Sequence, residues 1–275
     1  MSRTPVCMTI AGSDSGGGAG IQADLKTFAS LGSYGLSVIT ALTAQNTSRV
    51  EGIYPVAADF VSLQLKTLLD DFQIDAIKIG MLYQTEIIFA IQHHLRVFSG
   101  KWILLDPILC SSSGTPLLTE EARQTMIQVL FPLVTLLTPN LAEAQSLAGA
   151  TLHTRDEIEQ GGKKIIEMGP SAVLIKGGHT AGNECGDCLI SKTRTGEFVF
   201  NWFTHERVKT LNTHGTGCTL SAAIAAYLAA GSSLTDAVQQ GKAYLTGALL
   251  AGKNWKIGKG NGPLPHFFNR RLNMP

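Results

Sequence analysis

The chain is poor in the features that mark several large classes of protein. Its 275 residues include five cysteines, at positions 7, 110, 185, 188 and 218, an odd number without regular spacing. This pattern argues against a disulfide framework and predicts a reduced, cytoplasmic protein. No apolar run reaches the roughly 18 residues of a membrane-spanning helix, and the N-terminus lacks the layout of a secretory signal.

Net charge and aromatic content are equally low. Lys and Arg number 22 against 21 Asp and Glu, so the formal net charge is +1, and aromatic residues make up 7% of the chain. Because nucleic-acid-binding domains carry basic patches, this balance argues against nucleic acid as the main partner. The sequence also lacks a Pro/Ser-rich linker or a break in composition, and we expect a single α/β domain over residues 1–275.

Short apolar runs alternate with segments of helical periodicity along most of the chain. The predicted strands are 6–11, 34–42, 76–79, 102–105, 134–137 and 173–175, and the predicted helices are 19–31, 58–69, 85–95, 120–130, 156–168 and segments starting at 141, 217 and 234. Single helices between strands indicate a parallel sheet covered on both faces. Residues 187–192 and 197–203 predict a hairpin that extends this sheet with antiparallel strands.

The segment 209–227, which contains His-Gly-Thr-Gly-Cys, predicts a helix start that binds an anion. Gly215 and Gly217 bracket a turn, and strong helix formers follow. The free N–H groups and the dipole of a first helical turn favour a phosphate. Cys218 lies among these donors, where its pKa is expected to be lowered, so it is a candidate base or nucleophile. An ordinary glycine turn with Cys218 as a small core residue explains this segment alone equally well.

In parallel sheets of this kind, ligands bind beyond the carboxyl ends of the strands. Asp106, Glu143 and Lys176 all fall at predicted strand ends. Asn140 and Glu143 are candidates to contact a hydrated Mg²⁺ near phosphates, with Asp106 as a further carboxylate, because Mg²⁺ keeps most of its waters. For Asn140 and Glu143 the alternative is a helix cap and an acidic residue that complements the helix dipole.

Three other motifs are absent or weak. Residues 18–23 fit the dinucleotide pattern G-x-G-x-x-A, but the second strand ends near Gln45 instead of the acidic residue that holds a ribose. No G-x-x-x-x-G-K-[ST] phosphate loop occurs. Cys185 and Cys188 form a lone C-x-x-C with His179 nearby, which offers three ligands where a closed zinc site needs four.

Seven segments together resemble the bacterial hydroxymethylpyrimidine and phosphomethylpyrimidine kinases, members of the ribokinase-like superfamily. They are residues 9–28, 38–47, 78–82, 138–144, 176–179, 212–221 and 258–263, and they extend nearly from end to end. The resemblance implies a three-layer α/β/α fold, commonly a homodimer. It also implies an enzyme that uses Mg-ATP to phosphorylate 4-amino-5-hydroxymethyl-2-methylpyrimidine, and then its monophosphate, for thiamine synthesis.

The resemblance also implies roles for individual residues. The implied contacts are Gln45, Gly12, Asp24 and Met81 for the pyrimidine, Lys176, Asn140 and Thr213 for ATP, and Glu143 and Asp106 for Mg²⁺. Cys218 would accept the proton of the hydroxymethyl group or orient that hydroxyl. The backbone N–H groups of the turn, contributed by Gly215, Thr216 and Gly217, would stabilise charge on the moving phosphoryl group.

One loop departs from the pattern of close relatives. They usually carry Lys-Ser-Gly after the residue equivalent to Asp106, whereas this chain reads Cys-Ser-Ser-Ser-Gly from Cys110. A cysteine in this lid resembles relatives that act on pyridoxal, although Cys110 lies one place earlier. A pyridoxal or pyridoxine kinase therefore stays open as an alternative. So does a non-catalytic ligand-binding sensor, against which Cys218, Lys176 and Glu143 argue.

Overall fold

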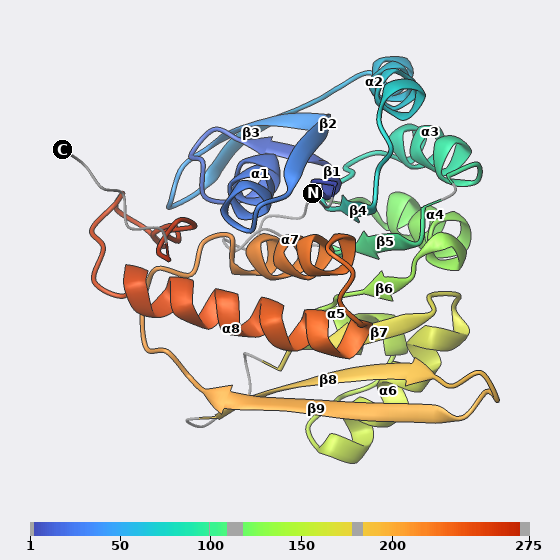
Figure 1. The fold of residues 1–275 in the computed structure, drawn as a ribbon, viewed down its shortest axis with the longest axis vertical. Helices are drawn as coiled ribbons and strands as arrows, with labels where there is room; N and C mark the ends of the chain where they lie inside the picture. The colour runs from blue at the N-terminus through green and yellow to red at the C-terminus, as the bar shows by residue number, and fades with distance from the viewer. Residues whose placement is uncertain (1–2, 99, 109–117, 178–183, 270–275) are drawn as a thin grey trace.

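A single nine-stranded sheet forms the centre of the molecule (Figure 1). The computed structural model describes residues 3–98, 100–108, 118–177 and 184–269. The strands are β1 Val6–Asp14, β2 Tyr34–Gln45, β3 Val50–Pro55, β4 Ala76–Ile79, β5 Trp102–Leu105, β6 Leu136–Leu137, β7 Ala172–Ile175, β8 Glu184–Lys192 and β9 Phe198–Glu206. Their order is β3-β2-β1-β4-β5-β6-β7-β8-β9. The six strands from β2 to β7 in this order are parallel, and β3, β8 and β9 pair antiparallel.

Helices cover both faces of the sheet, which gives three layers. They are α1 Gly20–Ser30, α2 Ala58–Asp71, α3 Thr85–Leu95, α4 Glu120–Val129, α5 Leu141–Ala148, α6 Arg155–Glu167, α7 Thr216–Ala229 and α8 Leu234–Gly252, with a short 3₁₀ turn at Phe131–Leu133. Buried residues of α2 to α6 share one hydrophobic core with the sheet. Those of α1, α7 and α8 share a second core on the opposite face. The predicted α/β/α architecture is confirmed.

Strand β4 shows how the sequence divides its side chains between the two faces. Ile77 and Ile79 belong to the core beneath α2 to α6, whereas Ala76 belongs to the core beneath α1 and α7. Side chains alternate along a strand, so Lys78 points to the same face as Ala76. A lysine therefore enters the layer between the sheet and α7, where it is fully buried.

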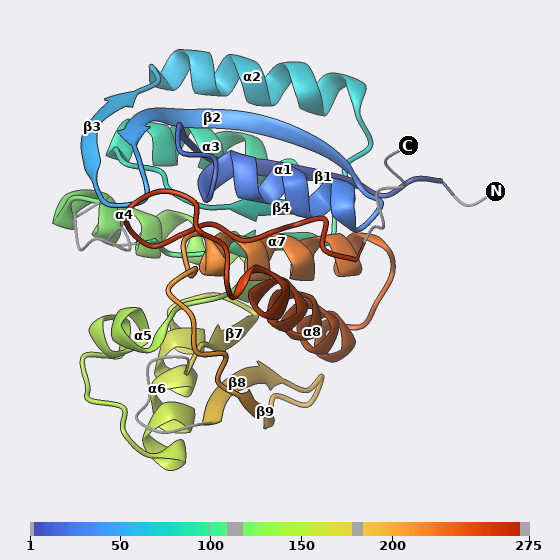
Figure 2. The ribbon, with the colours of Figure 1, turned by 90° about the vertical axis from the view of Figure 1, so that its left-hand side faces the viewer.

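Helix α7 is apolar around most of its circumference because it lies between the sheet and α8. Ten of its fourteen residues are buried. Figure 2 shows α7 and α8 running side by side, and α7 also contacts α1 and the parallel strands. A helix enclosed in this way needs no polar face. Its N-terminus meets the carboxyl ends of the strands.

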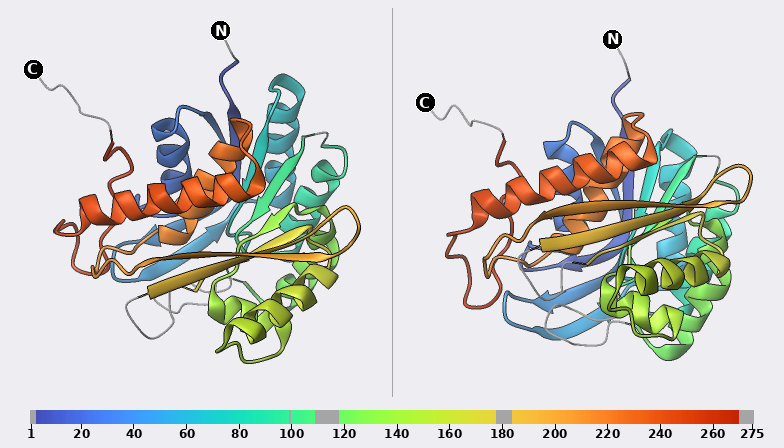
Figure 3. Two further views of the ribbon diagram at one scale, coloured as in Figure 1. Left: turned by 60° about the horizontal axis from the view of Figure 1, so that its bottom comes forward. Right: turned by 90° about the horizontal axis from the view of Figure 1, so that it is seen from below.

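Most predicted elements agree with the structure, and the differences have local causes. The sequence analysis missed β3, whose residues are mostly exposed or half-buried and so carry little hydrophobic signal. Strand β2 continues three residues beyond the predicted strand 34–42 and ends at Gln45. The predicted hairpin is confirmed as β8 and β9 at one edge of the sheet (Figure 3). Cys110 and His179 lie outside the described residues, as does the side chain of Cys185.

None of the described helices, including α8 with its 19 residues, combines the length and hydropathy needed to cross a membrane.

Candidate active site

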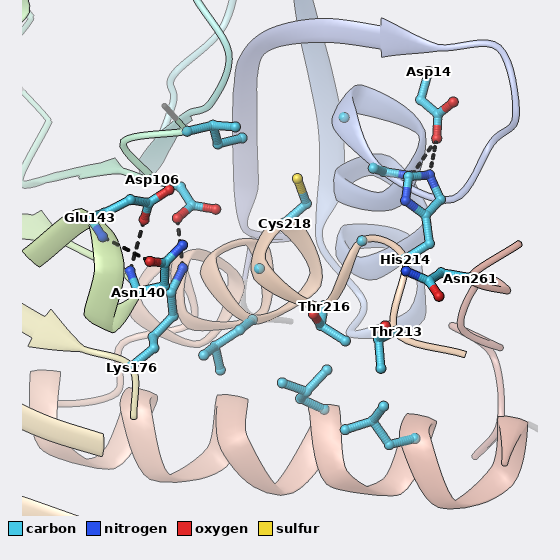
Figure 4. Close-up of a pocket in the computed structure, with 18 of the residues that line it drawn as sticks. Asp14, Asp106, Asn140, Glu143, Lys176, Thr213, His214, Thr216, Cys218 and Asn261 are labelled. Atoms are coloured by element: carbon cyan, nitrogen blue, oxygen red, sulfur yellow. Dashed lines mark hydrogen bonds and ion pairs between the residues drawn. The ribbon is translucent and has the colours of Figure 1, made fainter. Parts of the chain in front are cut away.

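A cavity of about 840 Å³ opens where the carboxyl ends of the strands meet the start of α7 (Figure 4). Twelve of the thirteen residues predicted for the site line it: Gly12, Gln45, Met81, Asp106, Asn140, Glu143, Lys176, Thr213, Gly215, Thr216, Gly217 and Cys218. These residues come from segments spread over the whole chain. The topology therefore brings together the polar strand ends that the sequence pattern singled out.

The turn before α7 has the geometry of an anion-binding helix start. Gly215 has a φ of +82°, a conformation that favours glycine, and a Cβ there would lie 1.8 Å from the carbonyl oxygen of Gly18. No side chain of the described residues caps the helix. Gly217 and Cys218 line the cavity in the first turn of α7, and no described side chain caps their N–H groups, as in helix starts that bind phosphate.

A cluster of opposite charges lies beside this turn. Lys176 Nζ donates to Asp106 Oδ1 at 2.8 Å, and Thr138 Oγ1 donates to the same oxygen at 3.2 Å. Burial lowers the pKa of Lys176, but the charges of Asp106 and Glu143 outweigh that effect and raise the pKa above its usual value. Lys176 is therefore a permanent cation at the wall of the cavity.

Asn140 and Glu143 form a capping box at the start of α5. Glu143 N–H donates to Asn140 Oδ1 at 2.9 Å, and Asn140 N–H donates to Glu143 Oε2 at 2.8 Å. The structural alternative considered from the sequence is therefore realised. It does not displace the functional one, because both residues also line the cavity.

The carboxylates of Asp106 and Glu143 fit a hydrated Mg²⁺ and do not fit an all-protein metal cage. Among the described residues, no group of three or more His, Cys, Asp or Glu side chains could hold a metal ion. Mg²⁺ commonly keeps several waters and binds one or two carboxylates together with substrate phosphates. Two carboxylates beside an anion-binding turn are consistent with that mode.

Three of the four residues predicted to bind the pyrimidine, Gly12, Gln45 and Met81, lie at or just after the ends of β1, β2 and β4. Gln45 Oε1 accepts a hydrogen bond from Thr43 Oγ1 at 3.2 Å, which orients its amide. A Cβ at Gly12 would lie 3.2 Å from Met81 Sδ, so glycine keeps this part of the cavity open. The wall therefore offers one amide and an apolar thioether, a combination suited to a flat, hydrogen-bonding heterocycle.

Asp24 does not line the cavity, and the prediction that it does is wrong. Its side chain is fully buried on α1, below the cavity wall. There Asp24 Oδ2 accepts from Thr9 Oγ1 at 2.6 Å and pairs with Lys78 Nζ at 2.8 Å. The sequence pattern placed Asp24 near the site but could not tell a lining residue from one behind the wall.

Cys218 lines the cavity as predicted, but its acidity is opposite to the expectation. Its side chain is 7% exposed, and burial raises the pKa of the thiol to about 11. Lys78 and an N–H donated by Gly20 act in the opposite direction, without reversing the effect of burial. Helix position alone predicted a thiolate, whereas the structure gives a neutral thiol at pH 7.

The sequence analysis missed a buried pair between Asp14 and His214. His214 Nε2 lies 2.8 Å from Asp14 Oδ2, and the same carboxylate accepts N–H groups from Gly16, Gly18 and Ala19 at 2.8–3.0 Å. Burial raises the pKa of Asp14, but these hydrogen bonds outweigh it and hold the pKa below its usual value. The pair joins the glycine loop after β1 to the turn before α7.

Comparison with known proteins agrees with this geometry. The family model described as phosphomethylpyrimidine kinase matches residues 14–265. The hydroxymethylpyrimidine/phosphomethylpyrimidine kinase of Escherichia coli (strain K12) is 46% identical over 261 residues, 94% of this chain and 96% of the relative. The enzyme of that name from Rhizobium meliloti (strain 1021) is 47% identical over 266 residues, 96% and 97% of the two chains.

Solved structures give the same result for the fold. Phosphomethylpyrimidine kinase from Clostridium difficile 630 has a TM-score of 0.79 at 41% identity, over 90% of this chain and all of that chain. Pyridoxal kinase from Staphylococcus aureus, in complex with AMP-PCP and pyridoxal, has a TM-score of 0.87 at 33% identity, over 98% and 96% of the two chains. From the family match and the identities over nearly its full length, we conclude that this chain belongs to the phosphomethylpyrimidine kinase family.

Proposed function

We propose that this chain transfers a phosphoryl group from ATP to 4-amino-5-hydroxymethyl-2-methylpyrimidine and then to the resulting monophosphate. The observation that carries the proposal is one cavity lined by the amide of Gln45, the thiol of Cys218 and the anion-binding turn before α7. Its relatives of 46–47% identity carry the name of this kinase. The activity serves the synthesis of thiamine.

The nucleotide phosphates are assigned to the Lys176 side of the cavity. Lys176 and the N–H groups of Gly217 and Cys218 supply positive charge there, and Asn140 and Thr213 line the same cavity. Staphylococcus aureus pyridoxal kinase has been solved with ADP and with AMP-PCP. Apolar side chains of α8 continue the cavity wall beyond Thr213 and suit a flat base.

Asp106 and Glu143 would hold Mg²⁺ through its waters. Magnesium would supply charge neutralisation on the transferred phosphoryl group. The contribution of the protein itself is positional: Lys176 fixes Asp106, and the capping box fixes Glu143 and Asn140. Held in this way, the two carboxylates do not need to reorganise when the nucleotide binds.

Cys218 is assigned to the substrate hydroxyl. As the bond between that oxygen and the γ-phosphorus forms and the bond to the bridging oxygen of ADP breaks, the hydroxyl proton passes to Sγ and then to solvent. Because the thiol pKa is about 11, the neutral thiol predominates at pH 7. Cys218 therefore orients the hydroxyl while it is a neutral thiol, and it accepts the hydroxyl proton in the minor fraction of molecules in which it is a thiolate.

Pyridoxal kinase is the nearest alternative, because its backbone is at least as similar as that of the pyrimidine kinase structure. Sequence identity separates the two, at 37–47% for the pyrimidine kinases against 32–34% for the pyridoxal kinases. The experiment is an ATP-dependent assay of the purified protein with hydroxymethylpyrimidine, its monophosphate, pyridoxal and pyridoxine side by side. We expect the highest kcat/KM with the two pyrimidines. A higher kcat/KM with pyridoxal would contradict the proposed substrate. No turnover with any of the four compounds would contradict the proposed kinase activity.

A further inference from the structure

A fully buried ion pair lies between α1 and the sheet and does not line the cavity. Lys78 on β4 and Asp24 on α1 both have exposures of 0%, and Lys78 Nζ lies 2.8 Å from Asp24 Oδ2. Lys78 is the register partner of Thr9 on β1, and Thr9 Oγ1 donates to the same Asp24 oxygen at 2.6 Å. Three elements thus converge on one charged group that touches neither the cavity nor solvent.

Stability alone does not account for this pair. Burying two charges costs several kcal/mol per ion, and replacing such a pair by apolar residues is often neutral or stabilising. The remaining oxygen of the carboxylate, Asp24 Oδ1, is buried without a hydrogen-bond partner among the described residues. The buried pair is therefore weak evidence for a role in stability alone.

The Lys78 end of the pair lies in the layer between the sheet and α7. Lys78 shares the sheet face of Ala76, against which α1 and α7 pack, and α7 contacts β4 directly. The charged groups that act on Cys218 come from four elements: Lys78 on β4, Asp24 on α1, Asp106 after β5 and Lys176 after β7. Among the charges that lower the pKa of this thiol, Lys78 has the largest effect.

We propose that Lys78 is a positioning residue that acts through Cys218, and that Asp24 holds it in place. Its ammonium group is the buried counter-ion for the negative charge that forms on Sγ when the thiol loses its proton. The N–H of Gly20 is a second, neutral donor to the same sulfur. Lys78 thereby raises the fraction of reactive thiolate above what burial alone would leave.

This inference rests on the proposed role of Cys218 in the kinase reaction, but it is tested without substrate. Only the thiolate reacts with iodoacetamide, so the alkylation rate below the thiol pKa is proportional to the thiolate fraction. The probe is iodoacetamide at pH 7–9.5 on the apoprotein, and mass spectrometry of the Cys218 peptide reports the rate. A wild-type protein that alkylates as expected but phosphorylates no pyrimidine would contradict the proposed function and leave this inference standing.

Variants of Lys78 and Asp24 should change the alkylation rate of Cys218 in opposite directions. Lys78→Met removes the counter-ion, and we expect Cys218 to be alkylated about tenfold more slowly, since a nearby charge shifts a pKa by about one unit or more. Asp24→Asn leaves the ammonium uncompensated, so alkylation should be faster. Lys66→Met removes a lysine that pairs with Asp70 on the exposed surface of α2 and is the matched control, with an unchanged rate.

Partial unfolding cannot imitate the key result. An exposed cysteine has a pKa of about 8.5, so loss of structure would accelerate alkylation in every variant. Should Lys78→Met fail to fold because Asp24 is left unpaired, the double variant Lys78→Met, Asp24→Asn removes both charges. We expect this double variant to alkylate more slowly than wild type, since Lys78 has a larger effect than Asp24. A rate at or above that of wild type in the folded double variant would overturn the proposal.

Discussion

At the scale of single residues, the behaviour of Cys218 follows from its surroundings more than from its position on a helix. The first turn of α7 and Lys78 favour a thiolate, but burial has the larger effect and raises the pKa to about 11. Desolvation penalises a charge more than a partial helix dipole stabilises it when the group is almost fully enclosed. The sulfur nevertheless lines the cavity, so it is available to a substrate hydroxyl.

Replacement of Cys218 should separate catalysis from nucleotide binding. We expect Cys218→Ala to lower kcat by about 10²–10⁴-fold, the usual loss of a general base, with little change in the KM for ATP. In the wild type, the thiolate fraction rises as pH approaches the thiol pKa of about 11, so kcat/KM for the pyrimidine should increase between pH 7 and pH 9. Steady-state kinetics across this range provide the check, with Cys188→Ala, a buried cysteine of β8 that does not line the cavity, as the control. A Cys218→Ala enzyme of near-normal kcat would remove this residue from the reaction.

Asp24 and Asp14 show what sequence reasoning can and cannot give for the site. Twelve of thirteen predicted residues line one cavity because polar groups after parallel strands must meet at one edge of the sheet. Asp24 was misplaced because its depth depends on Lys78, which is 54 residues away and unrelated by any local pattern. The Asp14–His214 pair was missed for a similar reason, since its partners lie 200 residues apart. The roles in catalysis and binding of the twelve residues that line the cavity stay predictions.

At the scale of elements, α5 and α6 form a natural pair for comparison. Each helix starts with a capping box, Asn140 with Glu143 on α5 and Thr154 with Glu157 on α6. Only the first lines the cavity, whereas Glu157 lies on an exposed part of the surface. One capping box therefore lies at the proposed metal site and the other lies away from it.

This pairing yields a matched test of the proposed magnesium site. Glu143→Gln and Glu157→Gln both keep an acceptor for the cap N–H and remove one charge, so each should leave the denaturation midpoint nearly unchanged. We expect only Glu143→Gln to raise the Mg²⁺ concentration needed for half-maximal kinase activity, by about tenfold. Chemical denaturation and magnesium titrations measure the two effects. Equal magnesium dependence in both variants would leave Glu143 as a helix cap alone.

Strand β3 marks the limit of element prediction in this chain. Its residues are mostly exposed, so neither alternation nor an apolar run identified it. The short strands β4 and β5 were predicted with their observed bounds because they are buried and bounded by polar residues. Such predictions depend on the pattern of apolar residues, and a strand shows that pattern only where its side chains are buried.

At the scale of the whole molecule, fold and family were predictable while assembly was not. The predicted three-layer fold and the family are confirmed by the sheet order and by relatives over nearly the full chain. A single domain, a homodimer and a cytoplasmic location stay predictions. The loop with Cys110, which bears on pyridoxal as substrate, lies outside the described residues.

The central claim is that a pyrimidine alcohol and ATP meet in the cavity over Cys218. A crystal structure with hydroxymethylpyrimidine and AMP-PCP tests it most directly. The account predicts that the pyrimidine ring contacts the amide of Gln45 and that the hydroxymethyl oxygen lies within hydrogen-bonding distance of Cys218 Sγ. It also predicts that the terminal phosphate lies at the N–H groups of Gly217 and Cys218. A heterocycle bound away from Gln45, or a γ-phosphate facing away from the start of α7, would contradict it.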